Sequence, residues 1–264
     1  MKKKLLITLG CSYIEGEGIY DYSLIEPNTE ISDYWTHGTE LYDRFQEKNL
    51  DNFHTKGIPA KLGEMLGFDK VINMGFRGSS TSGQLKVLFE KYQNPNFKDY
   101  DVTILWLLTE PCRISFYSDG RVLNFNGGSW GDKLYRAYIQ EVSDGQVDCL
   151  LEQSFYINSF EHYCKLNNFK SYIFHSNPEF VPALKEINTS KSIMDMDRTL
   201  FGILNGKEGY HSKICDHPNE LGYEIIAKQL FKHIQEHTGE TYVSNPNVEI
   251  VYNGNPEKYK KKVL

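Results

Sequence analysis

The stretch LLITLGCSYIEG, residues 5–16, is an apolar run that breaks at a glycine, with a cysteine and a serine directly after it. Short apolar runs bounded by turn residues are typical of strands buried on both faces of a parallel sheet. In such sheets the carboxyl ends of the strands carry the ligand site, because loops and helix N-termini converge there. Ser12 lies just past such an end. Serine is also a common turn and cap residue, so Ser12 indicates a site only together with other residues.

The rest of the chain alternates between short apolar runs and longer segments of helical period. This alternation is typical of a parallel sheet that is covered by helices on both faces. It predicts a three-layer α/β/α, flavodoxin-like sandwich with a central parallel sheet. We expect strands at residues 4–10, 69–75, 100–109 and 170–176, and helices at residues 58–68, 81–93, 146–169 and 219–239.

Two segments do not fit the alternation and are predicted to be insertions into a domain of residues 1–240. Residues 19–57 are predicted to be a lid or binding loop, because they are long and rich in aromatic residues. These aromatic residues are Tyr20, Tyr22, Tyr34, Trp35 and Tyr42. Residues 114–135, the second insertion, contain Asp-Gly between alternating apolar positions, which predicts a β-hairpin.

Residues 241–264 follow the domain and are predicted to form an extended C-terminal arm, available for self-association or assembly.

The composition excludes several classes of protein. The chain has 264 residues, of which 40% are hydrophobic, enough for one substantial packed domain. A net charge of -6 offers no basic face to a phosphate backbone, so we expect no nucleic-acid partner. No run approaches the roughly 18 apolar residues of a membrane span, and the apolar part behind the N-terminal lysines is too short for a signal peptide. Together with five scattered cysteines, this predicts no membrane partner and a cytoplasmic protein.

Two further stretches bring small and basic groups to the same predicted sheet edge. NMGFRGSS, residues 73–80, ends the second strand, and Gly78 can bring its N–H close to a bound oxygen because it has no side chain. A plain tight turn explains this glycine equally well. CDHPNELGYEIIA, residues 215–227, places His217 directly before a proline and the cap of a helix, which would fix the imidazole near the edge. A lone histidine is usually a surface or core residue, so these stretches indicate a site only in combination.

In their order and spacing, the three stretches resemble the motifs of the SGNH (GDSL-like) hydrolase family. GCSYIEG stands where that family has Gly-Asp-Ser-x-x-x-Gly, with Cys11 in place of the aspartate. NMGFRGSS is similar to the family's second block, and HPNELGYEIIA to its closing His-Pro-Asn-x-x-Gly block. The resemblance spans residues 5 to about 235, apart from the two insertions, and implies the SGNH hydrolase fold. It implies that Ser12 is the nucleophile, that His217 is the general base, and that the N–H groups of Ser12 and Gly78 donate to the oxyanion.

The chain departs from the family pattern at the third block, where the family has an asparagine that also donates to the oxyanion. Thr109 stands at this place, and its hydroxyl has one donor and a shorter reach. Arg113 is a second candidate for binding an anion here, although a surface ion pair with Glu110 explains it as well.

The second departure concerns the acid that orients the histidine, because Ile214 stands where the family has an aspartate. Asp216 adjoins His217 and is our candidate for the third catalytic residue, although neighbouring side chains on an extended segment diverge. Glu208 and His211 form a second acid and histidine pair at the family's spacing, but without the Pro-Asn-x-x-Gly context. A dyad of Ser12 and His217 is the remaining alternative.

Three cysteines are expected near the same edge and raise the alternative of a soft metal site with His211 or His217. Buried free cysteines are common as small apolar residues, and no short paired spacing supports chelation. We therefore expect no metal and no cofactor. The three cysteines are Cys11, Cys112 and Cys215.

Two functions fit these observations. The first is a serine esterase or deacylase that hydrolyses an O-acyl ester through a Ser-His centre and a backbone oxyanion hole. Its substrate would be a small-molecule or carbohydrate ester, since the aromatic insertion can stack on sugar rings, although tyrosines in a loop can equally pack that loop against the protein. The second is a binding or assembly protein that keeps the scaffold with reduced or absent catalysis, such as a virion or surface component. Thr109 and Ile214 favour the second function, whereas Ser12, Gly78 and His217 favour the first, which is our prediction.

Overall fold

The computed structural model describes residues 2–34, 39–91, 97–111, 113–118, 121–125, 146–196, 198–204, 209–215 and 217–253. The described strands are β1 (Lys3–Leu9), β2 (Lys70–Asn73), β3 (Tyr100–Leu108), β4 (Ile114–Ser118), β5 (Arg121–Phe125), β6 (Lys170–His175) and β7 (Glu249–Tyr252). The α-helices are α1 (Ser12–Glu15), α2 (Glu40–Lys48), α3 (Leu50–Lys56), α4 (Ile58–Met65), α5 (Thr81–Lys91), α7 (Gln146–Asn167), α8 (Val181–Ile187), α9 (Leu200–Leu204) and α10 (Glu220–Thr238). Three 3₁₀ turns are η1 (Tyr22–Leu24), η2 (Ile31–Tyr34) and η3 (Pro178–Phe180).

The central sheet has five parallel strands in the order β6-β3-β1-β2-β7. The prediction of a three-layer α/β/α protein with a central parallel sheet is confirmed. Four of the strands, β2-β1-β3-β6, follow the 2-1-3-4 order of flavodoxin-like sheets. The order reverses between β1 and β3, and in such sheets ligands bind outside the carboxyl ends of the strands at this point. The loop after β1 therefore begins at the position where a site is expected.

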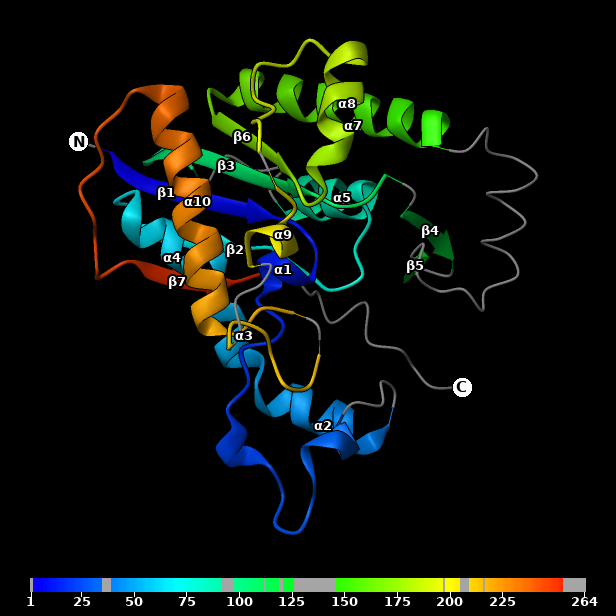
Figure 1. Ribbon diagram of the computed structural model, residues 1–264. Coiled ribbons are helices and arrows are strands. Elements are labelled where there is room, and N and C mark those ends of the chain that lie inside the picture. Colours follow the sequence, from blue (N-terminus) through cyan, green and yellow to red (C-terminus); the bar gives the residue numbers. More distant parts are fainter. Residues whose placement is uncertain are drawn as a thin grey trace.

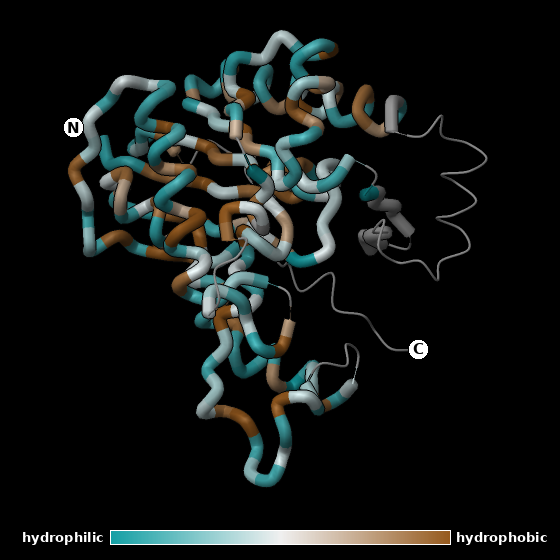
Figure 2. Tube along the Cα trace, viewed as in Figure 1, coloured by the Kyte–Doolittle hydropathy of each residue, from teal (hydrophilic) through white to brown (hydrophobic). Residues whose placement is uncertain are grey.

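Helices cover both faces of the sheet because the strand residues alternate between two hydrophobic cores. In β1, Leu6 packs into one core, whereas Leu5 and Ile7 pack into the other. The first core is completed by α4 and α10, and the second by α5, α7 and α8 (Figure 1). Figure 2 shows hydrophobic residues along the central strands, with hydrophilic residues frequent on the outer turns of the helices.

The described residues of the insertion 19–57 form two helices and two 3₁₀ turns, so this segment has more regular structure than the predicted loop. It extends from the body of the molecule below the sheet in the view of Figure 1. Tyr20, Tyr34 and Tyr42 are buried and Tyr22 is partly buried, whereas Trp35 lies outside the described residues. Tyr20 and Tyr34 pack against Phe45 of α2 with ring centroids 5.3 and 4.7 Å apart. These tyrosines therefore stabilise the insertion itself, and the three buried rings are not available for stacking on a sugar.

The predicted hairpin in the second insertion is confirmed, since β4 and β5 pair as antiparallel strands. The remainder of that insertion, residues 126–135, lies outside the described residues.

Part of the predicted C-terminal arm belongs to the central sheet. Residues 249–252 form β7, which pairs in parallel with β2. This strand was not predictable from the sequence, because only a few apolar residues mark it. Residues 254–264 lie outside the described part of the chain.

Within the described residues, none of the helices combines the length and the apolar character needed to cross a bilayer.

Candidate active site

Ser12 is the first residue of the short helix α1, and two residues, Gly10 and Cys11, separate it from the end of β1. Its side chain is largely buried, and Cys11 occupies the N-cap position. The loop after β2 is tied to this turn, because Phe76 N–H and Ser79 Oγ–H both donate to the carbonyl of Gly10. Among the described residues, no hydrogen bond uses the backbone N–H of Ser12, as expected at the first position of a helix.

His217 is held by the segment that precedes α10. Its carbonyl accepts from Ser212 N–H at 2.9 Å. Asn219 caps α10, as predicted, by accepting from Gly222 N–H at 3.0 Å. The Asn219 amide also donates to the carbonyls of Gly209 and His211 at 2.5 and 3.4 Å. A single capping residue therefore fixes both the start of the helix and the loop that carries the imidazole.

The structure brings Ser12 and His217 together. Ser12 Oγ lies 2.7 Å from His217 Nε2, a normal length for a hydrogen bond. The ring of Tyr13 lies against the imidazole, with centroids 5.4 Å apart. The His217 side chain is 23% exposed, so the pair can be reached from solvent.

The approach of the chain to His217 requires Gly18. This residue has φ of +109°, a left-handed conformation that side chains rarely adopt. A Cβ atom here would collide with the carbonyl oxygen of Pro218 and lie 2.9 Å from His217 Cβ. The absence of a side chain at residue 18 thus lets the loop after α1 pack directly on the His217 backbone.

The other predicted binding residues occupy the loops after β2 and β3. Gly78 has φ of +71°, and none of the described hydrogen bonds uses its N–H. Thr109 is 1% exposed and directly follows β3, and its carbonyl accepts from Gln153 Nε2 at 3.0 Å. Its Oγ1 is buried without a hydrogen-bond partner among the described residues. Arg113 is engaged in an ion pair with Glu110, with 3.2 Å between Nε and Oε2, which agrees with its alternative interpretation.

The two predicted acids, Asp216 and Glu208, lie outside the described residues. Ile214 is buried in the core that contains α10, so the family's usual place for the acid is occupied by a hydrophobic contact. The backbone of His211 forms a bridge to Pro218, which places it beside the loop that carries His217.

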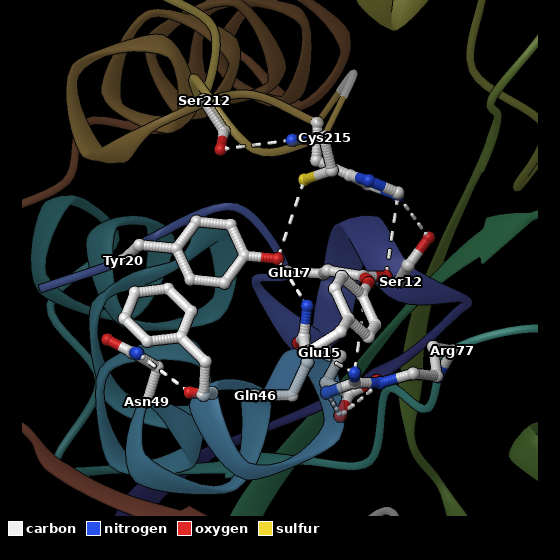
Figure 3. A network of polar contacts seen from close by, with 12 residues as sticks. Ser12, Glu15, Glu17, Tyr20, Gln46, Asn49, Arg77, Ser212 and Cys215 are labelled. Carbon is white, nitrogen blue, oxygen red and sulfur yellow. Dashed lines mark hydrogen bonds and ion pairs between the residues drawn. The ribbon is translucent and has the colours of Figure 1, made fainter. Parts of the chain in front are cut away.

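Sequence reasoning missed a charged cluster beside Ser12, in which the buried Glu15 and Glu17 meet the partly exposed Arg77 (Figure 3). Glu17 Oε2 lies 3.7 Å from His217 Nε2. Arg77 directly precedes Gly78, and Glu15 and Glu17 flank Gly16 in the sequence IEGEG. In the sequence, this cluster is marked only by two acids beside glycines shortly after the predicted nucleophile. The cation that both acids share, Arg77, is 60 residues beyond Glu17, and the sequence alone does not pair it with them.

Charges compensate one another within this cluster. Arg77 N–H donates to Glu15 Oε2 at 2.6 Å, and its guanidinium lies 3.1 Å from Glu15 Oε1. Burial by itself would raise the pKa of Glu15, but His54 and Arg77 outweigh it and lower that pKa below its usual value. Burial would likewise lower the pKa of Arg77, but Glu15 and Glu17 raise it. Both partners of the Glu15–Arg77 pair are therefore ionised at neutral pH.

A second buried network supports the carboxyl ends of β3 and β6. His175 Nδ1 accepts from Asn177 N–H at 3.0 Å, so Nε2 carries the proton and donates to Gln153 Oε1 at 3.3 Å. The Gln153 amide in turn donates to Thr81 Oγ1 and to the Thr109 carbonyl. Burial lowers the pKa of His175 to about 3, so the ring is neutral and structural.

In the described part of the chain, His, Cys, Asp and Glu residues form no group of three or more that could hold a metal ion. Of the three cysteines considered above, Cys11 is buried and Cys215 is partly buried, and Cys112 lies outside the described residues.

Comparisons with known proteins give distant likenesses. No protein-family model and no curated protein matches the sequence. The lipase Lip_vut3 from goat rumen metagenome has a similar structure, with a TM-score of 0.44 and 18% identity over 88% of this chain and 97% of the lipase. A two-domain esterase (CEX) active on acetylated mannans has a TM-score of 0.41 and 12% identity over 92% of this chain, which spans about half (52%) of that esterase. The function of this chain has to be inferred from its own side chains.

Proposed function

We propose that this protein is a serine hydrolase of the SGNH type that cleaves an O-acyl ester. The observation that carries the proposal is the 2.7 Å contact between Ser12 Oγ and His217 Nε2 at the carboxyl edge of the sheet. A serine hydroxyl is a poor nucleophile at neutral pH unless a neighbouring base takes its proton, and this contact supplies that base.

In the proposed reaction, Ser12 Oγ attacks the ester carbonyl while its proton passes to His217 Nε2. The tetrahedral intermediate collapses, the alcohol leaves with the proton from Nε2, and the acyl group stays on Ser12. Water then attacks the acyl-enzyme by the same route, with His217 again as the base. The reaction releases a carboxylic acid and restores the Ser12 hydroxyl.

The negative charge on the carbonyl oxygen needs preorganised donors. The proposal assigns this role to the backbone N–H groups of Ser12 and Gly78, neither of which is used by the described hydrogen bonds. Thr109 is the third proposed donor, supported by a buried hydroxyl for which the described residues supply no partner. Arg113 has the least support among the predicted binding residues, since its guanidinium is already paired with the carboxylate of Glu110.

The acyl acceptor is a separate proposal. A carbohydrate acceptor remains a candidate, but the burial of Tyr20, Tyr34 and Tyr42 removes the stacking surface on which it was based. We propose a small O-acyl ester as the substrate class, to be narrowed with a panel of acetylated sugars and simple alcohol esters.

The test uses p-nitrophenyl acetate and a fluorophosphonate probe, which reacts with activated serines. Wild-type protein and a control variant, Ser244→Ala at an exposed serine before β7, are expected to turn over the ester and to take up the probe. Ser12→Ala is expected to lose both signals while retaining the wild-type unfolding temperature. Equal weak turnover in wild type and Ser12→Ala would refute the enzyme and favour the binding or assembly protein.

A further inference from the structure

The charged cluster beside Ser12 contains more negative than positive charge. Glu15 is 3% exposed and Glu17 is 5% exposed, and a buried carboxylate needs a compensating partner. Both acids use the same guanidinium, since Arg77 lies 3.1 Å from Glu15 and 3.8 Å from Glu17. Among the described residues, the other groups that pair with these acids are the imidazoles of His54 and His217. With neutral imidazoles, two carboxylates and one guanidinium leave a net charge of -1.

Glu17 faces the imidazole of His217 with the oxygen that Arg77 does not use. Its Oε2 lies 3.7 Å from His217 Nε2, whereas its Oε1 accepts from the Tyr42 hydroxyl at 3.3 Å and faces Arg77. The backbone carbonyl of Glu17 accepts from the Tyr223 hydroxyl at 2.7 Å. The residue is thus held by α2 through its side chain and by α10 through its backbone.

The insertion completes this arrangement. From α2, Tyr42 contacts Glu17, and Gln46 Oε1 accepts from Arg77 Nη1 at 2.8 Å (Figure 3). The same Gln46 donates through Nε2 to the Tyr20 hydroxyl. Residues 19–57 therefore supply the polar groups that fix both Glu17 and its counter-ion.

We propose that Glu17 is a positioning residue that stabilises the imidazolium form of His217. When Nε2 takes the proton of Ser12, the matching negative charge develops on the substrate's carbonyl oxygen. The net charge of Glu15, Glu17, Arg77 and His217 taken together then rises from -1 to zero. A carboxylate at 3.7 Å in a buried setting favours that protonated state. This inference rests on the proposed function. It differs from the usual triad, in which the acid binds the ring nitrogen that faces away from the serine.

The decisive variant is Glu17→Gln, which keeps the size of the side chain and removes its charge. We expect kcat on p-nitrophenyl acetate to fall roughly 10- to 100-fold with KM unchanged, because the lost interaction is made in the transition state. The acid limb of the kcat/KM profile should move to lower pH, because a less stabilised imidazolium loses its proton more readily. Glu17→Asp retains the charge and should restore part of kcat and of the limb's position.

Other ionisable groups face the same imidazole and are kept in both variants. Tyr13 of α1 packs on the ring, Cys215 lies on its own segment, and Arg77 lies behind Glu17. Asp216, outside the described residues, adjoins His217 in the sequence and is also unchanged. A shift of the limb in Glu17→Gln is therefore assigned to the one charge removed.

Tyr42→Phe keeps the test decisive if Glu17→Gln does not fold. Removing the hydroxyl that donates to Oε1 leaves more of the carboxylate's charge to act on His217, so the acid limb should move to higher pH. An unchanged limb in this variant, or unchanged kcat and limb in a folded Glu17→Gln, would overturn the inference. If wild-type protein instead shows no turnover beyond that of Ser12→Ala, the proposed function itself is wrong.

Discussion

Ser12 and His217 are 205 positions apart in the chain, and their side chains meet at 2.7 Å. The serine comes from the turn between β1 and α1, and the imidazole from the loop before α10. Both elements pack against the same core, which contains Ile14 of α1 and Tyr223 of α10. The contact therefore depends on the docking of α10 against the sheet.

Ser12 and His217 should act as a unit. We expect Ser12→Ala and His217→Ala each to lower kcat/KM for p-nitrophenyl acetate by roughly 10³-fold or more. The double variant should be no slower than either single variant, since neither residue works without the other. If the loss of kcat/KM in the double variant equals the product of the two single losses, Ser12 and His217 do not share one proton transfer.

Thr109→Val tests the third proposed oxyanion donor. Valine has nearly the shape of threonine. The buried Oγ1 has no hydrogen-bond partner among the described residues, so the substitution leaves none of them without a bond. The free energy of unfolding in urea should therefore be unchanged or slightly higher. kcat should fall by roughly 10²-fold, the usual effect of losing one oxyanion donor. A variant with wild-type kcat would remove Thr109 from the site.

Gly18→Ala should damage stability and activity together. The substitution forces a side chain into a left-handed conformation and against the backbone of His217 and Pro218. We expect a loss of about 1 to 3 kcal/mol in the free energy of unfolding, and a lower kcat because the imidazole is displaced. Gly239→Ala is the matched control, since Gly239 has φ of +66° and no atom within 4 Å of the added Cβ. That control should lose some stability and keep its kcat.

His175 should make the protein less stable in mild acid. Its pKa is about 3 in the folded protein and about 6.5 in an unfolded chain, so between these values the unfolded state binds more protons. Stability therefore falls as the pH drops below about 6.5, by about 2 kcal/mol at pH 5 from this residue. Urea unfolding at pH 7 and at pH 5 measures the difference.

His175→Asn should reduce that difference, because the titrating ring is gone while an acceptor for Asn177 N–H is retained. His162→Asn, at an exposed position on α7, serves as the control and should keep the wild-type difference. If both variants lose the same stability between the two pH values, His175 is not the source.

The elements with strong local patterns were predictable from the sequence. The strands β1 and β3 are nearly uninterrupted apolar runs, and α10 begins with a capping asparagine before a hydrophobic stripe. The pairing of β4 with β5 was predicted from an Asp-Gly pair between alternating apolar positions in the sequence. In each case the signal is contained within a few residues, so no tertiary contact is needed to detect it.

The charged cluster was not predictable because it depends on a distant segment. Glu17, Arg77 and Gln46 come from three separate loops or helices, and the packing of α2 beside the loops after α1 and β2 brings them together. The aromatic residues of the insertion predicted a lid or binding loop, whereas the fold buries Tyr20, Tyr34 and Tyr42. Burial of an aromatic residue in a long connection depends on whether that connection forms helices of its own, which the composition does not determine.

The parallel pairing of β7 with β2 has a consequence for synthesis of the chain. The residues of β2 leave the ribosome about 180 positions before their partner, since Lys70 is paired with Glu249. Until then one side of β2 presents unpaired N–H and C=O groups, which can recruit a strand of another nascent copy. Translation that stalls before residue 249 should therefore yield aggregates, even though Ser12, His217 and the other four strands of the sheet have already been made.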